Sequence, residues 1–274
     1  MYESYWHLKQ NPFDGFPDAE FFFESETHQA ALLKLRYLIE NRKGAGLLVG
    51  GGGYGKSFLL HVLAQQLTEQ DGPLIPILFP QMSPSELLAY IAAELGAKTD
   101  AEQEPLSVDR TIRQIQDVLV KFAERKRHPV IAIEEAHLID NPQVFQALRL
   151  LLNFQPQHGG AFTLILSGQR DLLSRIRRLP QLEERLTVKC LLRPLSYEET
   201  LGYVTHRLHA AGLNESPFEP SAFDTLFELS GGIPRRINRL CDLALLVGFA
   251  DGTTAISASQ LEAVSEELTA VVPD

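Results

Sequence analysis

Residues 46–60, GLLVGGGGYGKSFLL, constrain this chain more than any other stretch. An apolar run leads into a glycine turn, and the turn leads into a segment typical of a helix start. Residues 50–57 match G-x-x-x-x-G-K-[ST], the phosphate-binding (Walker A) pattern. Glycines let backbone N–H groups turn inward around an anion, and the following helix points its positive end at the same place. A flexible turn without a ligand is the alternative, but it does not explain a complete pattern between strand and helix.

The loop pattern also predicts which groups contact a nucleotide. Lys56 would reach the β- and γ-phosphates, and the Ser57 hydroxyl would be a ligand of Mg²⁺. We therefore expect ATP and Mg²⁺ as cofactors. The residues expected to bind the nucleotide in this stretch are Gly50, Gly51, Gly52, Gly53, Tyr54, Gly55, Lys56, Ser57 and Phe58.

Length and composition are those of an ordinary soluble protein. The 274 residues suffice for one large domain or two modest ones, and 45% of them are hydrophobic. No apolar run approaches the roughly 20 residues of a membrane helix, and the start MYESYWHLKQ lacks the features of a signal peptide. We expect a cytoplasmic protein without a membrane span. Its cysteines, Cys190 and Cys241, are then expected to be buried thiols.

The charge balance bears on nucleic-acid binding. A net charge of −10 argues against a protein whose whole surface grips nucleic acid. Local arginine clusters occur within 125–127, 170–178 and 235–239, and solvated helix faces are the alternative interpretation of each. Nucleic acid is therefore a possible partner that the composition does not favour.

Strands and helices alternate through the first two thirds of the chain. The strands are almost continuously apolar, which predicts a parallel α/β sheet covered on both faces. Pro76 suggests that the second strand lies at a sheet edge. The expected helices cover 25–41, 56–67, 83–95, 107–126 and 142–154, a polar loop covers 97–106, and the expected strands cover 46–49, 74–79, 129–137 and 162–167.

The remaining sequence predicts helices only. Ser196 and Glu199 form a capping box, as Ser83 and Glu86 do earlier. Apolar spacing places Tyr37 on the buried side of the first helix and Leu201 on that of the helix after Ser196. Further helices are expected over 220–229, 234–250 and 257–268. We therefore divide the chain into an aromatic segment (1–24), an α/β nucleotide-binding domain (25–193) and a small helical lid domain (194–274). The aromatic segment either packs on a core or also forms a wall for the adenine base.

An acidic pair ends the apolar strand before residue 134. Such a pair forms the second half of an ATPase site, in which one carboxylate holds the Mg²⁺ shell and the next polarises the attacking water. Glu134 is then the metal-side residue and Glu135 the catalytic base. Most such sites have Asp at the first position, so the extra methylene of Glu134 favours slow hydrolysis. His137 either orients the site or has a packing role.

Polar residues elsewhere complete the candidate site. After the next strand, Ser167 or Gln169 could bridge the water and the γ-phosphate, and we prefer Gln169. An arginine finger for a neighbouring subunit would come from Arg177, Arg178 or Arg185, unless these lie on a solvated helix face. In the small domain, GGIPRRIN over 231–238 begins a helix, from which an arginine can reach the γ-phosphate.

These motifs in combination resemble those of an AAA+ ATPase. The strand end IEEAH, then LSGQ, RPLSYEET and GGIPRRIN are most similar to the general secretion pathway protein A (ExeA-like) family, as is the opening MYESYW. The resemblance covers nearly the whole chain. It implies a P-loop α/β sheet in the order 5-1-4-3-2, a helical lid and ATP-dependent ring assembly. It also implies that Arg235 is the nucleotide-sensing arginine of the lid.

The chain departs from this family in three ways. Glu134 replaces the usual Asp, and Arg170 replaces the proline of the usual G-Q-P. Secretion members also continue into a membrane helix and a periplasmic peptidoglycan-binding domain, which this sequence does not contain, so a secretion-pore role is not implied.

The sequence thus predicts a Mg²⁺-dependent ATPase that switches or assembles a partner, forming a homo-oligomer with nucleotide. The alternatives are a nucleotide-binding scaffold with little turnover and a DNA-associated, transposition-type regulator. The protein partner cannot be named from the sequence. The expected catalytic residues are Glu135, Lys56, Gln169, Arg185 and Arg235, with Arg235 also binding nucleotide and with Ser57 and Glu134 at the metal.

Overall fold

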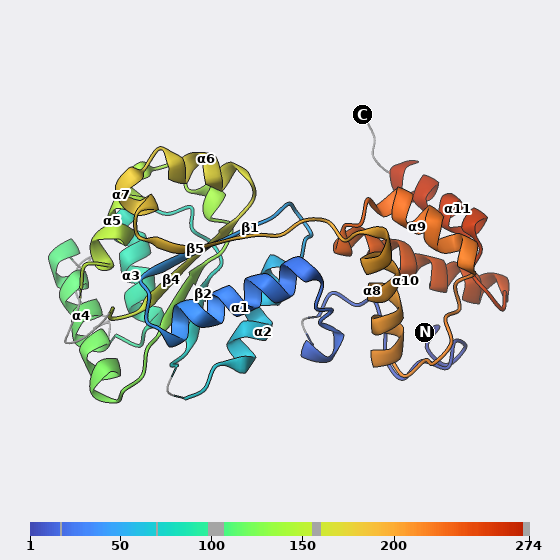
Figure 1. Ribbon diagram of the computed structural model, residues 1–274, viewed down its shortest axis with the longest axis horizontal. Coiled ribbons are helices and arrows are strands. Elements are labelled where there is room, and N and C mark those ends of the chain that lie inside the picture. The colour runs from blue at the N-terminus through green and yellow to red at the C-terminus, as the bar shows by residue number, and fades with distance from the viewer. Residues whose placement is uncertain (17, 70, 98–106, 155–159, 271–274) are drawn as a thin grey trace. The chain divides into compact units, whose positions relative to one another are not determined.

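The computed structural model describes residues 1–16, 18–69, 71–97, 107–154 and 160–270, which form two compact units (Figure 1). The sheet unit comprises 29–52 and 59–192. The helical unit comprises 1–28, 53–58 and 193–274. The second half of the phosphate-loop pattern, from residue 53, thus belongs to the helical unit, although the first half continues from a strand of the sheet unit. The polar loop expected over 97–106 lies almost entirely outside the described residues.

The sheet unit contains a five-stranded parallel sheet in the order β2-β3-β4-β1-β5. This confirms the expected order 5-1-4-3-2, and it places β2, with Pro76, at an edge. The strands are β1 (Ala45–Val49), β2 (Leu74–Ile77), β3 (Val130–Ile133), β4 (Thr163–Gly168) and β5 (Leu186–Leu191).

Helices cover both faces of the sheet, because the central strands present apolar side chains on both faces. Leu47 and Val49 belong to the core shared with the helices that follow β2. On the opposite face, Gly46 lies against α1 (Glu26–Glu40), where an added Cβ would come within 2.6 Å of Leu38. The other helices are α2 (Lys56–Gln66), α3 (Pro84–Glu94), α4 (Val108–Glu124), α5 (Pro142–Leu151), α6 (Asp171–Arg177) and α7 (Pro180–Glu183).

Several local predictions are confirmed and others are wrong. Ser83 and Glu86 form the expected capping box at the start of α3. Tyr37 was expected on the buried side of α1 but is half exposed. The second strand ends at Ile77 instead of residue 79, and the next two residues, Leu78 and Phe79, are exposed.

The helical unit consists of α8 (Tyr197–Ala210), α9 (Pro220–Ser230), α10 (Pro234–Asp251) and α11 (Ala258–Ala270), together with the N-terminal segment. That segment contains a short 3₁₀ helix, η1 (Ala19–Phe21), and buries aromatic rings in the core of the helices. The Trp6 indole N–H donates to the Leu245 carbonyl at 2.9 Å. The expectation that the aromatic segment packs on a core is therefore confirmed.

A buried arginine fixes the N-terminal segment to α8. The Arg207 guanidinium donates to the Asp14 carbonyl at 3.0 Å and lies 4.9 Å from the centre of the Phe21 ring. Ser196 and Glu199 form the expected capping box, but Leu201, which was expected to be buried, is 39% exposed. Its position on α8 shows that apolar spacing alone overestimates the width of the buried stripe.

Both thiols are free and buried, as expected for Cys190 and Cys241. Within the part of the chain that the structure describes, no helix is long and apolar enough to cross a membrane.

Candidate nucleotide site

The loop between β1 and α2 requires glycine at two positions. Gly53 and Gly55 have φ values of +79° and +84°, which side chains of L-residues rarely adopt. A Cβ on Gly53 would also lie 2.8 Å from the Cβ of Arg235. The pattern is therefore a defined backbone conformation, in which N–H groups can turn toward one ligand.

The second half of the loop contacts several residues within the helical unit. The backbone N–H of Arg235, in the first turn of α10, donates to the Gly53 carbonyl at 3.3 Å. Nε2 of His28 lies 2.8 Å from the Tyr54 carbonyl oxygen. Loop residues and the start of α10 are thus joined through the backbone, while the Arg235 side chain is exposed and available to a ligand.

The first half of the loop lies at the carboxyl edge of the sheet. The backbone N–H of Gly50 donates to the Gly168 carbonyl at 3.2 Å, and Val49 is in register with Gly168. On the other side of β4, Ile133 is in register with Leu166. The residue after β3, Glu134, therefore reaches the same edge as Gly50 and the end of β4.

The two carboxylates after β3 have different environments. Glu134 is only 8% exposed, and its backbone N–H donates to the Ile77 carbonyl at 2.9 Å. The Glu135 side chain is 40% exposed, and its backbone adopts φ +47° and ψ 32°. That left-handed conformation costs about 1–3 kcal/mol for a residue other than glycine. The chain turns here into η2 (Ala136–Leu138), so that one carboxylate stays buried and the next faces solvent.

His137 lies between the acidic pair and the end of β4. Its Nδ1 lies 3.5 Å from a carboxylate oxygen of Glu135 and accepts from the Gln169 backbone N–H at 3.4 Å. A Cβ on Gly168 would come within 3.1 Å of the His137 backbone nitrogen, so glycine allows this approach. The sequence allowed either an orienting role or a packing role for His137. The sequence signal for this contact is the glycine before Gln169, Gly168.

The other candidates are distributed over the sheet unit. The Ser167 hydroxyl is buried within β4 and has no hydrogen-bond partner among the described residues, whereas Gln169 is exposed beyond the strand. Arg177 and Arg178 are exposed at the end of α6. Arg185 is also exposed, and it donates to the side-chain oxygen of Asn153 at 2.8 Å. An exposed guanidinium is accessible to a second subunit, but a role there stays a prediction.

The donor types fit a nucleotide-bound Mg²⁺ ion. The hydroxyl of Ser57 and the carboxylate of Glu134 are oxygen ligands, which Mg²⁺ prefers, and the ion usually keeps several waters and phosphate oxygens as its other ligands. Among the described residues, no cluster of three or more His, Cys, Asp and Glu side chains could hold a metal by itself. Each side chain is therefore of a type that suits an ion arriving with a phosphate chain, and a shared ion stays a prediction.

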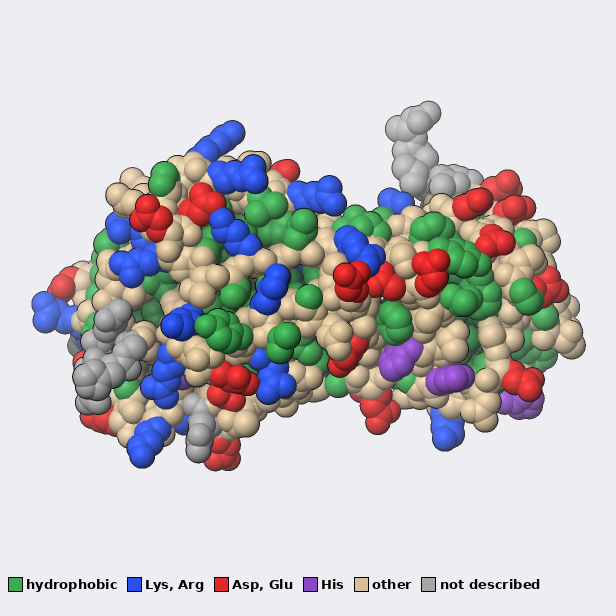
Figure 2. Space-filling model, in the orientation of Figure 1, with side chains coloured by type: hydrophobic (Ala, Val, Ile, Leu, Met, Phe, Trp, Pro, Cys, Tyr) green, Lys and Arg blue, Asp and Glu red, His purple; other side chains and the backbone are tan. Residues whose placement is uncertain are grey.

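Surface charge on the sheet unit is mixed. Figure 2 shows Lys and Arg side chains scattered over its visible face, with acidic side chains among them. This distribution offers positions for local anion contacts. DNA binding stays a prediction that the net charge of −10 does not favour.

Comparison with known families identifies two similarities. A family model described as an AAA domain matches residues 39–176. The chain is also 34% identical to the general secretion pathway protein A of Aeromonas hydrophila over 279 residues, which cover 99% of this chain and 49% of the relative. The chain thus spans about half the length of that relative. Both findings agree with the resemblance indicated by the motifs.

Solved structures share the fold. The Aeropyrum pernix ORC2 protein, solved as ADPNP-ADP complexes, matches with a TM-score of 0.71 and 15% identity, covering 97% of this chain and 73% of that protein. The Thermotoga maritima RuvB Holliday junction branch migration motor matches with a TM-score of 0.61 and 20% identity, covering 94% and 74%. At these identities the similarity establishes a P-loop α/β fold.

Proposed function

The chain belongs to the AAA domain family, and we propose that it is a Mg²⁺-dependent ATPase whose nucleotide state switches or assembles a partner complex. The observation that carries this proposal is the loop between β1 and α2, with left-handed Gly53 and Gly55 immediately before Lys56. Such a loop surrounds an anion with backbone N–H groups at a helix N-terminus. An acidic pair follows the strand two places away in the same sheet.

Each residue then has a distinct task. The loop N–H groups and Lys56 hold the phosphates, while Ser57 and Glu134 hold the ion, which when bound neutralises charge on the phosphate oxygens. Glu135, on the exposed side of the turn after β3, takes the proton of the attacking water. Gln169 orients that water from the end of β4.

Two arginines act on the phosphate chain from different places. Arg235 belongs to the first turn of α10 in the proposed lid domain, and it would sense the γ-phosphate within one chain. Arg185 is our candidate for the finger supplied to a neighbouring subunit, with Arg177 and Arg178 as alternatives. Loss of the finger would abolish hydrolysis while leaving most monomer affinity for nucleotide.

Glu134 keeps a second candidate function open, a nucleotide-binding scaffold with little turnover. Its side chain is one methylene longer than Asp, and it is buried. A buried side chain has little freedom to move aside. The longer side chain would therefore displace the water shell of the ion. Slow hydrolysis is the expected consequence under the main proposal, and background hydrolysis is expected under the second.

The relative suggests the cellular setting. It is a general secretion pathway protein A, so a secretion- or envelope-associated partner on the cytoplasmic side is our proposal for this chain. The ADPNP and ADP complexes of the Aeropyrum pernix protein support nucleotide as the ligand. The partner itself would be identified by what co-purifies with the Glu135→Gln variant in ATP.

Nucleotide binding should also favour self-association. A ligand that bridges two subunits stabilises the assembly by its differential affinity for that state. Light scattering over a protein concentration series, with ATP, ADP or no nucleotide, should show larger particles with ATP. Monomers under all conditions, with turnover per chain independent of concentration, would remove the oligomer from the proposal.

Calorimetric titration with Mg·ATP tests the binding proposal. The unsubstituted protein should bind about one nucleotide per chain, and Lys56→Ala should lose binding because the phosphate charge is no longer matched. An exposed lysine of the sheet unit, Lys43, provides the control as Lys43→Ala. Equal binding by all three proteins would refute the assignment of the loop.

A further inference from the structure

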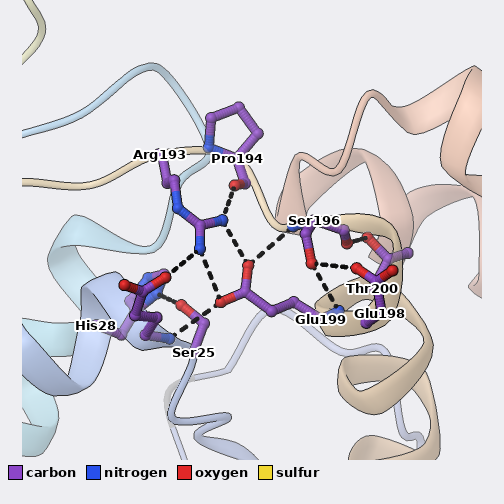
Figure 3. Close-up of polar contacts among 9 residues, drawn as sticks. Ser25, His28, Arg193, Pro194, Ser196, Glu198, Glu199 and Thr200 are labelled. Atoms are coloured by element: carbon purple, nitrogen blue, oxygen red, sulfur yellow. Dashed lines mark hydrogen bonds and ion pairs between the residues drawn. The ribbon is translucent and has the colours of Figure 1, made fainter.

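His28 makes two hydrogen bonds from a buried position in the helical unit. Its Nδ1 lies 2.7 Å from the Ser25 hydroxyl, and its Nε2 lies 2.8 Å from the Tyr54 carbonyl oxygen. Figure 3 shows the first contact, with the His28 ring directed toward Ser25. The second contact joins the first turn of α1 to the middle of the phosphate loop.

The two partners determine where the ring carries its proton. A carbonyl oxygen only accepts, so Nε2 must carry hydrogen to bond with Tyr54. Nδ1 of the neutral ring then accepts from the Ser25 hydroxyl. Burial lowers the pKa of His28, which favours this neutral form at physiological pH. Ser25 thus holds the ring in the tautomer that serves the loop.

The position of the Tyr54 carbonyl determines where the next N–H of the loop points. It belongs to the planar peptide that also carries the N–H of Gly55, so fixing the oxygen fixes the direction of that N–H. The flanking glycines have positive φ, which leaves this peptide few other constraints. Gly55 also leaves room for the ring, since a Cβ there would lie 3.1 Å from Nε2 of His28.

The start of α1 is itself anchored within the helical unit. The Glu199 carboxylate accepts from the Glu26 backbone N–H at 3.0 Å and from the Arg193 guanidinium at 2.7 Å. Arg193 also donates to the Glu26 carboxylate at 2.7 Å. Glu199 at the same time completes the capping box with Ser196 at the start of α8. The turn that carries His28 is therefore joined to the first turn of α8.

We propose that His28 is a positioning residue for nucleotide binding, which orients the Tyr54–Gly55 peptide so that the Gly55 N–H faces the phosphates. The inference rests on the proposed function, because its effect is on nucleotide affinity. It adds a contact from outside the loop pattern, and it connects the loop to the residues at which α1 and α8 begin. A packing role is the alternative, since the Phe22 ring lies edge-on to His28 at 6.1 Å.

Two amide variants separate the two roles. Gln places its amide nitrogen near the position of Nε2, whereas Asn reaches only the position of Nδ1. In calorimetric titrations with Mg·ADP and Mg·ATP, His28→Asn should weaken binding about tenfold, corresponding to one lost hydrogen bond of about 1.4 kcal/mol. His28→Gln should remain within about threefold of the unsubstituted protein. The unfolding midpoint without nucleotide is measured for each variant.

Equal affinity of the unsubstituted protein and His28→Asn would overturn the inference, as would equal weakening in both variants, which indicates packing. Ser25→Ala retains the ring and provides a second test if His28→Asn does not fold. This variant should weaken nucleotide binding about threefold, because the ring is no longer held in the tautomer that carries hydrogen on Nε2. Unchanged affinity would contradict the inference. If the unsubstituted protein does not bind nucleotide, both the proposed function and the inference fail. If it binds and the variants match it, only the inference fails.

Discussion

The carboxylate of Glu135 lies 3.5 Å from Nδ1 of His137, and the same nitrogen accepts from the Gln169 backbone N–H. A nitrogen that accepts from Gln169 carries no proton, so Nδ1 does not donate to the carboxylate at the same time. It holds the Gln169 backbone beside the turn that carries Glu135, whose own backbone is left-handed. We infer that His137 keeps Gln169, at the end of β4, in place beside the proposed catalytic base.

Replacing His137 should therefore affect turnover more than binding. His137→Phe keeps a ring but removes Nδ1, and kcat for ATP hydrolysis should fall about tenfold with little change in KM. His137→Asn retains a polar atom near Nδ1 and should remain closer to the unsubstituted enzyme. Steady-state phosphate-release assays give both constants. An equal loss in the two variants would assign His137 to packing instead.

Gly53 and Gly52 offer a matched pair in the loop. Gly53→Ala should weaken nucleotide binding by at least tenfold, because its φ of +79° and the nearby Arg235 Cβ both oppose a side chain. No described atom lies within 4 Å of a Cβ at Gly52, and no positive φ is required there. Gly52→Ala should therefore bind nearly as well as the unsubstituted protein. Comparable titration curves for the two variants would contradict the proposed loop geometry.

Much of this fold could be predicted from the sequence, because the central strands and the caps carry local signals. The apolar stretches of β1, β3 and β4 and the capping boxes at Ser83 and Ser196 needed no tertiary information. Strand β5 was not assigned from its residues. It is an edge strand whose exposed Thr187 and Lys189 interrupt the apolar pattern, and only the family resemblance implied a fifth strand.

For the candidate site, only the motifs could be read from the sequence. The phosphate loop and the acidic pair are contiguous motifs, so their proposed chemistry follows from spacing, and it stays a prediction. The contact between His28 and Tyr54 joins residues 26 positions apart. Nothing local distinguishes His28 from an ordinary buried histidine. Tyr37 and Leu201 were misassigned because helical spacing predicts a face but not which neighbour covers it.

Stability should depend on pH through His128. Burial, together with nearby Arg42, lowers the pKa of this histidine from 6.5 to about 4. In the unfolded chain this histidine is protonated below about pH 6.5, whereas in the folded protein it is protonated only below about pH 4. The associated stability, about 3 kcal/mol, is fully present above pH 6.5 and is lost as the pH falls toward 4. The lowered pKa values of His28 and His206 act in the same direction.

Urea unfolding between pH 7 and pH 4.5 measures this loss. With His128→Leu, the free energy of unfolding should fall less steeply as the pH decreases. The difference in slope should correspond to roughly one bound proton. The control is Thr163→Val, which removes the hydroxyl 2.9 Å from Nε2 but retains the buried ring, and should retain the steeper slope. An identical pH dependence in the unsubstituted protein and His128→Leu would show that His128 does not contribute to acid destabilisation.

The central claim is that this loop and acidic pair hydrolyse ATP, and phosphate release from the unsubstituted protein, measured beside Glu135→Gln with Mg·ATP, tests it most directly. We expect slow but measurable turnover in the unsubstituted protein. In Glu135→Gln it should fall about a hundredfold, because the amide cannot accept the proton of the attacking water. Nucleotide affinity should be similar in the two proteins. Equal, background-level phosphate release from both, with binding intact, would contradict the enzyme and leave a nucleotide-binding scaffold.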